Sequence, residues 1–237
     1  MSTLEKSTEN NIYLSVIDGT LRQSVPEGTV DAVKRDWEAG GKSGTKWELV
    51  YKATVGKIQA IDIYEGEKEG KKFQNLNIVL DENENGKIPV ISVGLKSRYA
   101  DDLLKKLPNV DLDEEVRFRP YSFQPDGEDR KVIGVELTQR NGVGQFENKV
   151  MSHFSKKVGD KWEALNGYPV PEGDTSTYSS DDWDIFYKQA RKFMVAYLMD
   201  NVIPKLESKT EEDKDTPKAN PWDKKEEEEI DPENIPF

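Results

Sequence analysis

Alternation of apolar and polar residues dominates the middle of this 237-residue chain. In residues 73–81 and in residues 87–95, apolar side chains recur at every second position and therefore lie on one face. This is the period of a half-buried strand. Before them, residues 47–64 are rich in β-branched and aromatic residues, with Gly56 near the middle. A glycine there allows a bulge and a sharp bend. This stretch therefore predicts a mainly β fold built around one long, bent strand.

The period changes once inside this β region. Residues 97–107 have apolar residues at helical spacing. Two more strands, 115–123 and 131–139, follow around a turn at 125–129. The order is a bent strand, two strands, a helix and two strands, which is typical of a five-stranded oligonucleotide-binding (OB) barrel. We place this barrel at about 47–140, and a generic small β-barrel or an α+β sandwich is the alternative.

Both flanks of the barrel are expected to add structure. Asp18-Gly19 predicts a hairpin over residues 12–24, and the spacing of three apolar residues predicts a short helix over 26–37. A long helix is predicted at about 180–203, with serine N-caps and acidic residues in its first turn. Its aromatic stripe favours packing on the barrel, and a homodimer interface is the second interpretation. We therefore divide the chain into an elaborated domain, 1–206, and an acidic, disordered tail, 207–237.

Composition argues against several classes of protein. The chain has no cysteine, which excludes disulfides and thiolate metal sites and fits a cytoplasmic setting. Its one histidine, His153, is too few for a multi-histidine metal site, and we interpret it as structural. No nucleotide-binding or nucleophile motif occurs, so we expect neither an enzyme nor a cofactor. We also expect no signal peptide and no membrane span.

The net charge of −12 is unevenly distributed. Residues 207–237 contain 12 acidic and 5 basic side chains, net −7, which leaves −5 for residues 1–206. A nucleic-acid interface must therefore depend on a local basic surface.

Strand 115–123 offers such a surface. Alternation assigns Val116 and Phe118 to the core and places four other side chains together on the opposite face. These are Arg117, Arg119, Tyr121 and Phe123. Guanidinium groups attract phosphates and aromatic rings stack on bases, so this face suits a single nucleic-acid strand. The alternative is that the two rings pack beneath residues 141–178.

Further cations and rings fall at the expected loops and strand ends around this face. OB folds bind ligands on strands two and three and on the loops joining strands one to two and four to five. The candidates near these places are Tyr64, Lys71, Lys72, Phe73, Lys96, Arg98, Arg130 and Lys131.

The end of the sequence, EEEEIDPENIPF, combines an acidic run with an apolar tip. A basic rim on a partner could attract the run, and a small apolar pocket could hold Ile235 and Phe237, with Pro236 restricting the tip. Trp222 is the one aromatic residue of the acidic tail before Phe237 and is a second candidate anchor.

This ending resembles the C-terminal tip of bacterial and phage single-stranded DNA-binding proteins, in which an acidic stretch closes on Ile-Pro-Phe. Asn234 departs from that pattern, where the bacterial tip usually carries Asp. The resemblance implies an OB-fold core, sequence-nonspecific binding of single-stranded DNA in phage replication, recombination and repair, and recruitment of replication proteins by the tail. An interaction adaptor, with a protein-binding barrel and a tail that mimics nucleic acid, is the alternative from another class.

Overall fold

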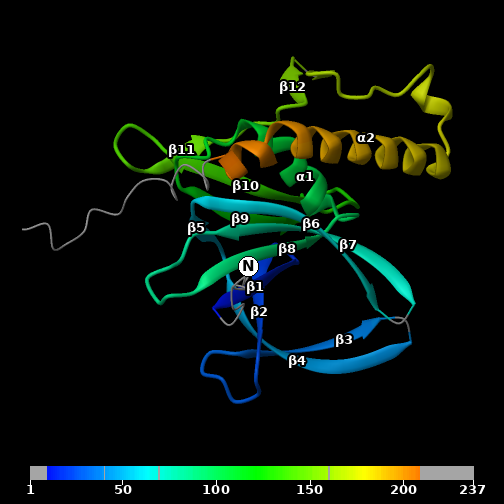
Figure 1. The fold of residues 1–237 in the computed structure, drawn as a ribbon. Coiled ribbons are helices and arrows are strands. Elements are labelled where there is room, and N and C mark those ends of the chain that lie inside the picture. The colour runs from blue at the N-terminus through cyan, green and yellow to red at the C-terminus, as the bar shows by residue number, and fades with distance from the viewer. Residues whose placement is uncertain (1–9, 40, 69, 160, 209–237) are drawn as a thin grey trace, which may run out of the picture.

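The computed structural model describes residues 10–39, 41–68, 70–159 and 161–208, and these form a mainly β structure with a large mixed sheet and two α-helices (Figure 1). The coarse prediction of a mainly β fold is confirmed. Residues 1–9 and 209–237 lie outside the described ranges, so the predictions for the acidic tail and for Trp222, Ile235, Pro236 and Phe237 stay predictions.

The large sheet has seven strands in the order β3-β4-β2-β1-β8-β7-β6. Neighbouring strands are antiparallel except for β1 and β8, which are parallel. Its strands are β1 (Asn11–Ile17), β2 (Thr20–Val25), β3 (Val33–Ala39), β4 (Lys42–Tyr51), β6 (Ile58–Lys68), β7 (Lys71–Leu80) and β8 (Ile88–Gly94).

A smaller sheet has the order β11-β10-β9-β5, and two short strands pair separately. The smaller sheet contains β5 (Thr54–Gly56), β9 (Val116–Phe123), β10 (Val132–Arg140) and β11 (Phe146–Lys149), and the separate pair is β12 (Ser155–Val158) and β13 (Lys161–Ala164). The helices are α1 (Arg98–Lys106), α2 (Ser180–Asn201) and the 3-10 turns η1 (Leu107–Asn109) and η2 (Thr175–Thr177).

The two sheets are joined by the bend between β5 and β6. The backbone N–H of Lys57 donates to Asp81 Oδ1, and the N–H of Asp81 donates to the Lys57 carbonyl, each over 2.9 Å. A Cβ atom at Gly56 would lie 2.6 Å from Asp81 Oδ1, so this close crossing requires glycine. The bend at Gly56 is thus as predicted. The single strand from Trp47 is wrong, because β4 ends at Tyr51 in the large sheet and β5 begins in the other sheet.

The N-terminal hairpin is confirmed, and the helix predicted at 26–37 is wrong. Asp18 and Gly19 turn the chain between β1 and β2 with φ of 46° and 75°. Gly28 and Asp31 also have positive φ, 85° and 62°, which interrupts a right-handed helix. The chain makes turns there and then forms β3, which pairs with β4.

One core joins both sheets and the helices. The helix predicted at 97–107 is α1, capped by Ser97, whose side chain accepts a hydrogen bond from the Ala100 N–H. The largest fully buried side chains come from β2, β7, β8, α1, η1, β9, β10, α2 and the segment before β12. They are Leu21, Leu76, Ile78, Leu80, Ile91, Leu103, Leu104, Leu107, Phe118, Leu137, Phe154 and Met194.

The C-terminal helix begins where predicted, because Ser179 and Asp182 form a reciprocal capping box. Only its second half is buried, through Ala190, Met194 and Leu198. Figure 1 shows α2 on the opposite side of the molecule from β3 and β4. The prediction that the whole aromatic stripe packs on the β core is therefore wrong for the first two turns. Residues 203–208 form a further helical segment, so residues 207 and 208 are not part of a disordered tail as predicted.

The described strands do not close into one barrel. β8 pairs with β7 on one side and with β1 on the other, so it has no edge left for β10. One edge of β10 is covered by α1, where the Val135 N–H donates to Asp102 Oδ2 over 2.7 Å. The turn of the β1–β2 hairpin lies against β9, since a Cβ at Gly19 would meet the Ser122 nitrogen at 2.5 Å. The N-terminal hairpin thus occupies an edge that a fifth barrel strand would use.

Candidate nucleic-acid interface

The face of the large sheet that points away from the core carries small polar side chains along its centre. Register places Asn77 opposite Ser92, Ser92 opposite Ser15, and Ser15 opposite Arg22. Paired residues on neighbouring strands project from the same face, so these side chains form one row. Asn75 Nδ2 donates to Ser92 Oγ over 3.1 Å, which fixes the amide beside the row. We call this surface the outer face of the large sheet.

Two aromatic rings lie together on this outer face. Tyr64 of β6 is 50% exposed and Phe73 of β7 is 39% exposed, with ring centroids 6.0 Å apart. Phe73 lies across Gly66, because a Cβ at Gly66 would be only 2.5 Å from the Phe73 ring. Strand pairing of Phe73 with Gly66 therefore lays the ring against the sheet and leaves its other side to solvent. Such a ring is a stacking platform.

Cations border this pair. Lys71 and Lys72 are exposed at the start of β7, and Lys96 is exposed just after β8. The Leu95 N–H donates to the Gln74 carbonyl over 2.8 Å, which holds the segment carrying Lys96 beside β7. The predicted group of Tyr64, Phe73 and the lysines is thus brought together at one end of the sheet.

The candidate residues of β9 share the opposite side of the smaller sheet from the core, as alternation predicted. Val116 and Phe118 are buried, whereas Phe123 is 54% exposed. Arg117 makes no ion pair within the described residues. Arg119 pairs with Glu136, which Lys149 also contacts at 3.3 Å. Burial raises the pKa of the Glu136 carboxyl, but the hydrogen bonds and charges of Arg119 and Lys149 together lower it by more. The pKa of Glu136 is therefore below its usual range.

Of the two aromatic rings on β9, that of Tyr121 is less exposed to solvent than that of Phe123. Its ring lies 6.1 Å from that of Phe123 and its hydroxyl lies over Gly134, beside Asp102. Burial and then the charges of Asp102 and Glu136 raise the pKa of Tyr121, so it stays a neutral phenol. The alternative that both rings pack beneath residues 141–178 is wrong for Phe123, which is exposed. The neighbours of Tyr121 named above, Phe123, Gly134 and Asp102, also lie outside that segment.

The two candidate surfaces point in different directions. Both sheets contribute to one core, so their outer faces turn away from it on different sides. The segment after β8 connects them, because Arg98 Nη1 donates to the Lys131 carbonyl over 3.5 Å, and Val132 pairs with Phe123. Arg130 and Lys131 are exposed there. The predicted residues thus form two aromatic groups linked by cations rather than one continuous face.

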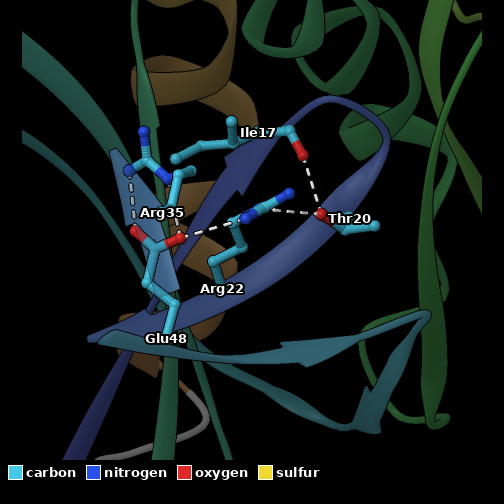
Figure 2. A network of polar contacts seen from close by, with 5 residues as sticks. All are labelled: Ile17, Thr20, Arg22, Arg35 and Glu48. Carbon is cyan, nitrogen blue, oxygen red and sulfur yellow. Dashed lines mark hydrogen bonds and ion pairs between the residues drawn. The ribbon is translucent and has the colours of Figure 1, made fainter. Parts of the chain in front are cut away.

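A polar network that the sequence did not predict lies at the far edge of the large sheet (Figure 2). Glu48 of β4 is 3% exposed and accepts hydrogen bonds from Arg35 Nε and Nη2, at 2.8 and 2.7 Å, and from Arg22 Nη1 at 3.1 Å. Arg22 Nε donates to the Thr20 hydroxyl over 3.2 Å. The hydrogen bond from Arg35 and the second arginine hold the pKa of Glu48 below its usual range against the cost of burial.

A groove of about 670 Å³ lies away from both sheets, between residues 168–172 and the first turns of α2. Its walls are rich in proline and aromatic residues, and Glu172 and Asp182 are acidic. The rings of Tyr178, Trp183 and Tyr187 pack side by side along this end of α2. A groove with acidic groups among its apolar walls suits a protein segment better than a phosphate backbone.

His153 has a structural role. Asn109 Nδ2 donates to the Met151 carbonyl, so Asn109 Oδ1 faces His153 Nδ1 at 2.7 Å. His153 therefore donates from Nδ1, and Nε2 accepts from the Tyr197 hydroxyl at 2.8 Å. The ring ties η1 to α2. Within the described ranges, no cluster of three or more His, Asp or Glu side chains has the arrangement of a metal site.

No protein family model, no curated protein and no solved structure matches this chain. Among the helices that the structure describes, none is long and apolar enough to cross a membrane.

Proposed function

We propose that this chain is a sequence-nonspecific single-stranded DNA-binding protein. The observation that carries the proposal is the two aromatic pairs, Tyr64 with Phe73 and Tyr121 with Phe123, each bordered by cations. Three of these rings, those of Tyr64, Phe73 and Phe123, are exposed. A folding chain buries aromatic rings when it can, so rings left exposed beside cations on a sheet surface suggest a ligand with flat apolar groups and negative charge.

The geometry suits a single strand of any sequence. Rings stack on every base, at about 1–3 kcal/mol per base, and cations at Lys71, Lys96 and Arg117 can contact phosphates without reading base edges. Because each phosphate contact releases counterions, the affinity should fall steeply as salt rises.

The order of elements supports an OB-type core within this fold. The bent strand β5–β6, then β7, β8, α1, β9 and β10 follow one another in the order of that fold. In this proposal β1 and β2 are an addition that takes the edge of β8.

The role we propose is protection of transient single strands during phage or viral DNA replication, recombination and repair, in the cytoplasm of an infected cell. The acidic tail would recruit replication proteins through Ile235, Pro236 and Phe237, with Trp222 as a second anchor. The exposed aromatic half of α2 is where a homodimer contact could form.

Titration of a labelled oligo(dT) against salt concentration tests the proposal. Replacing Lys71 or Arg117 with alanine should weaken binding and lower the salt slope by about 0.7 per lost phosphate contact. Replacing Phe73 or Phe123 with alanine should weaken binding by about 1–3 kcal/mol with the slope nearly unchanged. Tyr187→Ala is the matched control, because Tyr187 is 49% exposed on α2, away from both surfaces.

If wild-type protein shows no salt-sensitive binding, or if both phenylalanine variants bind like wild type while folded, the proposal is wrong. A loss of affinity in only one of the two phenylalanine variants identifies which surface binds the oligonucleotide.

A protein-interaction adaptor is the second candidate, and the groove beside α2 favours it. There the chain presents a groove of mixed apolar and acidic lining, which suits a protein segment. Absence of oligonucleotide binding together with loss of a protein partner on Ile185→Asp, a change at the groove wall, would support the adaptor instead.

A further inference from the structure

The outer face of the large sheet continues beyond the strands that an OB core would contribute. The row from Asn77 through Ser92 and Ser15 reaches Arg22 on β2, and Arg22 pairs with Val50 on β4. All of these side chains project from the face that carries Tyr64 and Phe73. The N-terminal strands therefore extend the candidate surface across the whole sheet.

Two guanidinium groups stand at the far edge of this surface. Glu48 holds Arg22 and Arg35 side by side, and their side chains remain 17% and 27% exposed. Arg22 uses Nε and Nη1 within the network, and Arg35 uses Nε and Nη2. Within the described residues, Nη2 of Arg22 and Nη1 of Arg35 make no hydrogen bond. Arg22, Arg35 and Glu48 together carry a charge of +1, and the carboxylate of Asp18 also acts on Arg35. The attraction for an anion therefore comes from the two guanidinium nitrogens that the network leaves unused.

An aromatic ring lies next to these arginines, as on the opposite edge. Trp37 follows Arg35 by two residues on β3, so it shares the outer face, and it pairs with Gly44. A Cβ at Gly44 would lie 3.0 Å from Trp37 Nε1, so the indole lies across that glycine. The Phe73–Gly66 arrangement is thereby repeated, with a ring laid against the sheet through a cross-strand glycine.

The two edges are far enough apart to contact different nucleotides. Measured along the sheet, five strand-to-strand steps separate β7 from β3, a path of roughly 24 Å at about 4.8 Å per step. The side chains of Asn75, Ser92 and Ser15, which lie between them, are small and polar. Tyr13, two residues from Ser15 on β1, is 54% exposed on the same face.

We propose that Arg22, Arg35 and Trp37 form a second contact for the same nucleic-acid strand, with phosphates on the guanidinium groups and a base on the indole. The proposal rests on the proposed function and extends it to the N-terminal strands. A strand held by Tyr64 and Phe73 would cross the serine row and reach this site only when it is long enough.

Oligo(dT) length separates the two contacts. We would titrate an oligonucleotide of about 6 nucleotides and one of about 20 nucleotides against wild type, Arg35→Gln and Trp37→Leu. Arg35→Gln keeps Glu48 paired with Arg22, and Trp37→Leu keeps apolar cover over Gly44. The matched charge control is Lys34→Gln, because Lys34 is exposed on the same strand but on the opposite face.

Arg35→Gln should lower the affinity for the long oligonucleotide only, with a salt slope reduced by about 0.7. Trp37→Leu should lower the affinity for the long oligonucleotide about 5-fold or more, with an unchanged salt slope. Lys34→Gln should match wild type at both lengths. Inorganic phosphate at millimolar concentration should not compete, which separates a strand contact from a simple anion site.

Equal loss at both lengths, equal loss in Lys34→Gln, or wild-type affinity of both folded variants for the long oligonucleotide would overturn this second contact while leaving the first intact. Failure of wild type to bind either length would instead reject the proposed function. Thermal melting of each variant confirms folding, and Trp37→Leu, which changes no charge, keeps the test valid if Arg35→Gln is unstable.

Discussion

Glycines on the outer face of the large sheet decide where its aromatic rings lie. Phe73 and Trp37 each pair with a glycine on the next strand, Gly66 and Gly44, and each ring occupies the space that a side chain would fill. A ring laid on the sheet loses little rotamer freedom when a base stacks on it. At this scale a glycine and an aromatic residue act as one unit, and the sequence separates them by only seven positions in both hairpins.

His153 gives a prediction at the same scale. Burial and the charge of Lys205 lower the pKa of His153 below its ordinary value. The unfolded chain therefore binds a proton more readily, and the stability of the folded state should fall as pH drops through about 6.5 and toward the lower folded pKa.

Urea unfolding at several pH values between about 7.5 and 5.5 measures this. His153→Gln, which cannot titrate, should lose less stability over the same range, although it should be less stable at neutral pH because a bond to Asn109 or Tyr197 is lost. Parallel pH profiles for the two proteins would contradict the assignment.

At the scale of elements, the Arg22–Glu48–Arg35 network holds β2, β3 and β4 together. Glu48→Gln would leave two partly buried guanidinium groups without their carboxylate, and we expect unfolding to become easier by about 2–4 kcal/mol. The matched control is Glu38→Gln on β3, because Glu38 is exposed. Urea unfolding monitored by circular dichroism gives both values, and a Glu48→Gln protein as stable as the control would show that the network contributes little.

The same network should respond to acid. Arg35 and Arg22 lower the pKa of Glu48, so its contribution is present above the unfolded value near 4.5 and is lost as pH falls through the folded pKa.

Over the whole molecule, charge is unevenly divided between residues 1–208 and residues 209–237. Residues 209–237 contain 11 acidic and 5 basic side chains, tethered to a domain with basic surfaces. A tethered acidic segment competes with DNA at high effective concentration. Deleting 209–237, which keeps the helical segment 203–208 and buried Leu206, should tighten oligo(dT) binding, most at low salt.

The proposed function gives the tail two roles, DNA competition and partner capture. Phe237→Ala should separate them, because it removes an apolar anchor and keeps every charge. Its DNA affinity should stay close to wild type while capture of replication proteins in a pull-down is lost. Retained capture would leave the tail only an electrostatic role.

Local elements could be predicted from the sequence because they depend on periods, turns and caps within short stretches. These are β7, β8, α1, β9, β10, the β1–β2 hairpin and the start of α2. The sequence also separated the buried Phe118 from the exposed Phe123. The pairing of β3 with β4, the pairing of β1 with β8, and the contact of Glu48 with two arginines were found in the fold and not in the sequence. Those outcomes depend on pairing between segments far apart in the chain, and a local pattern carries no information about which distant edge or charge a strand will meet.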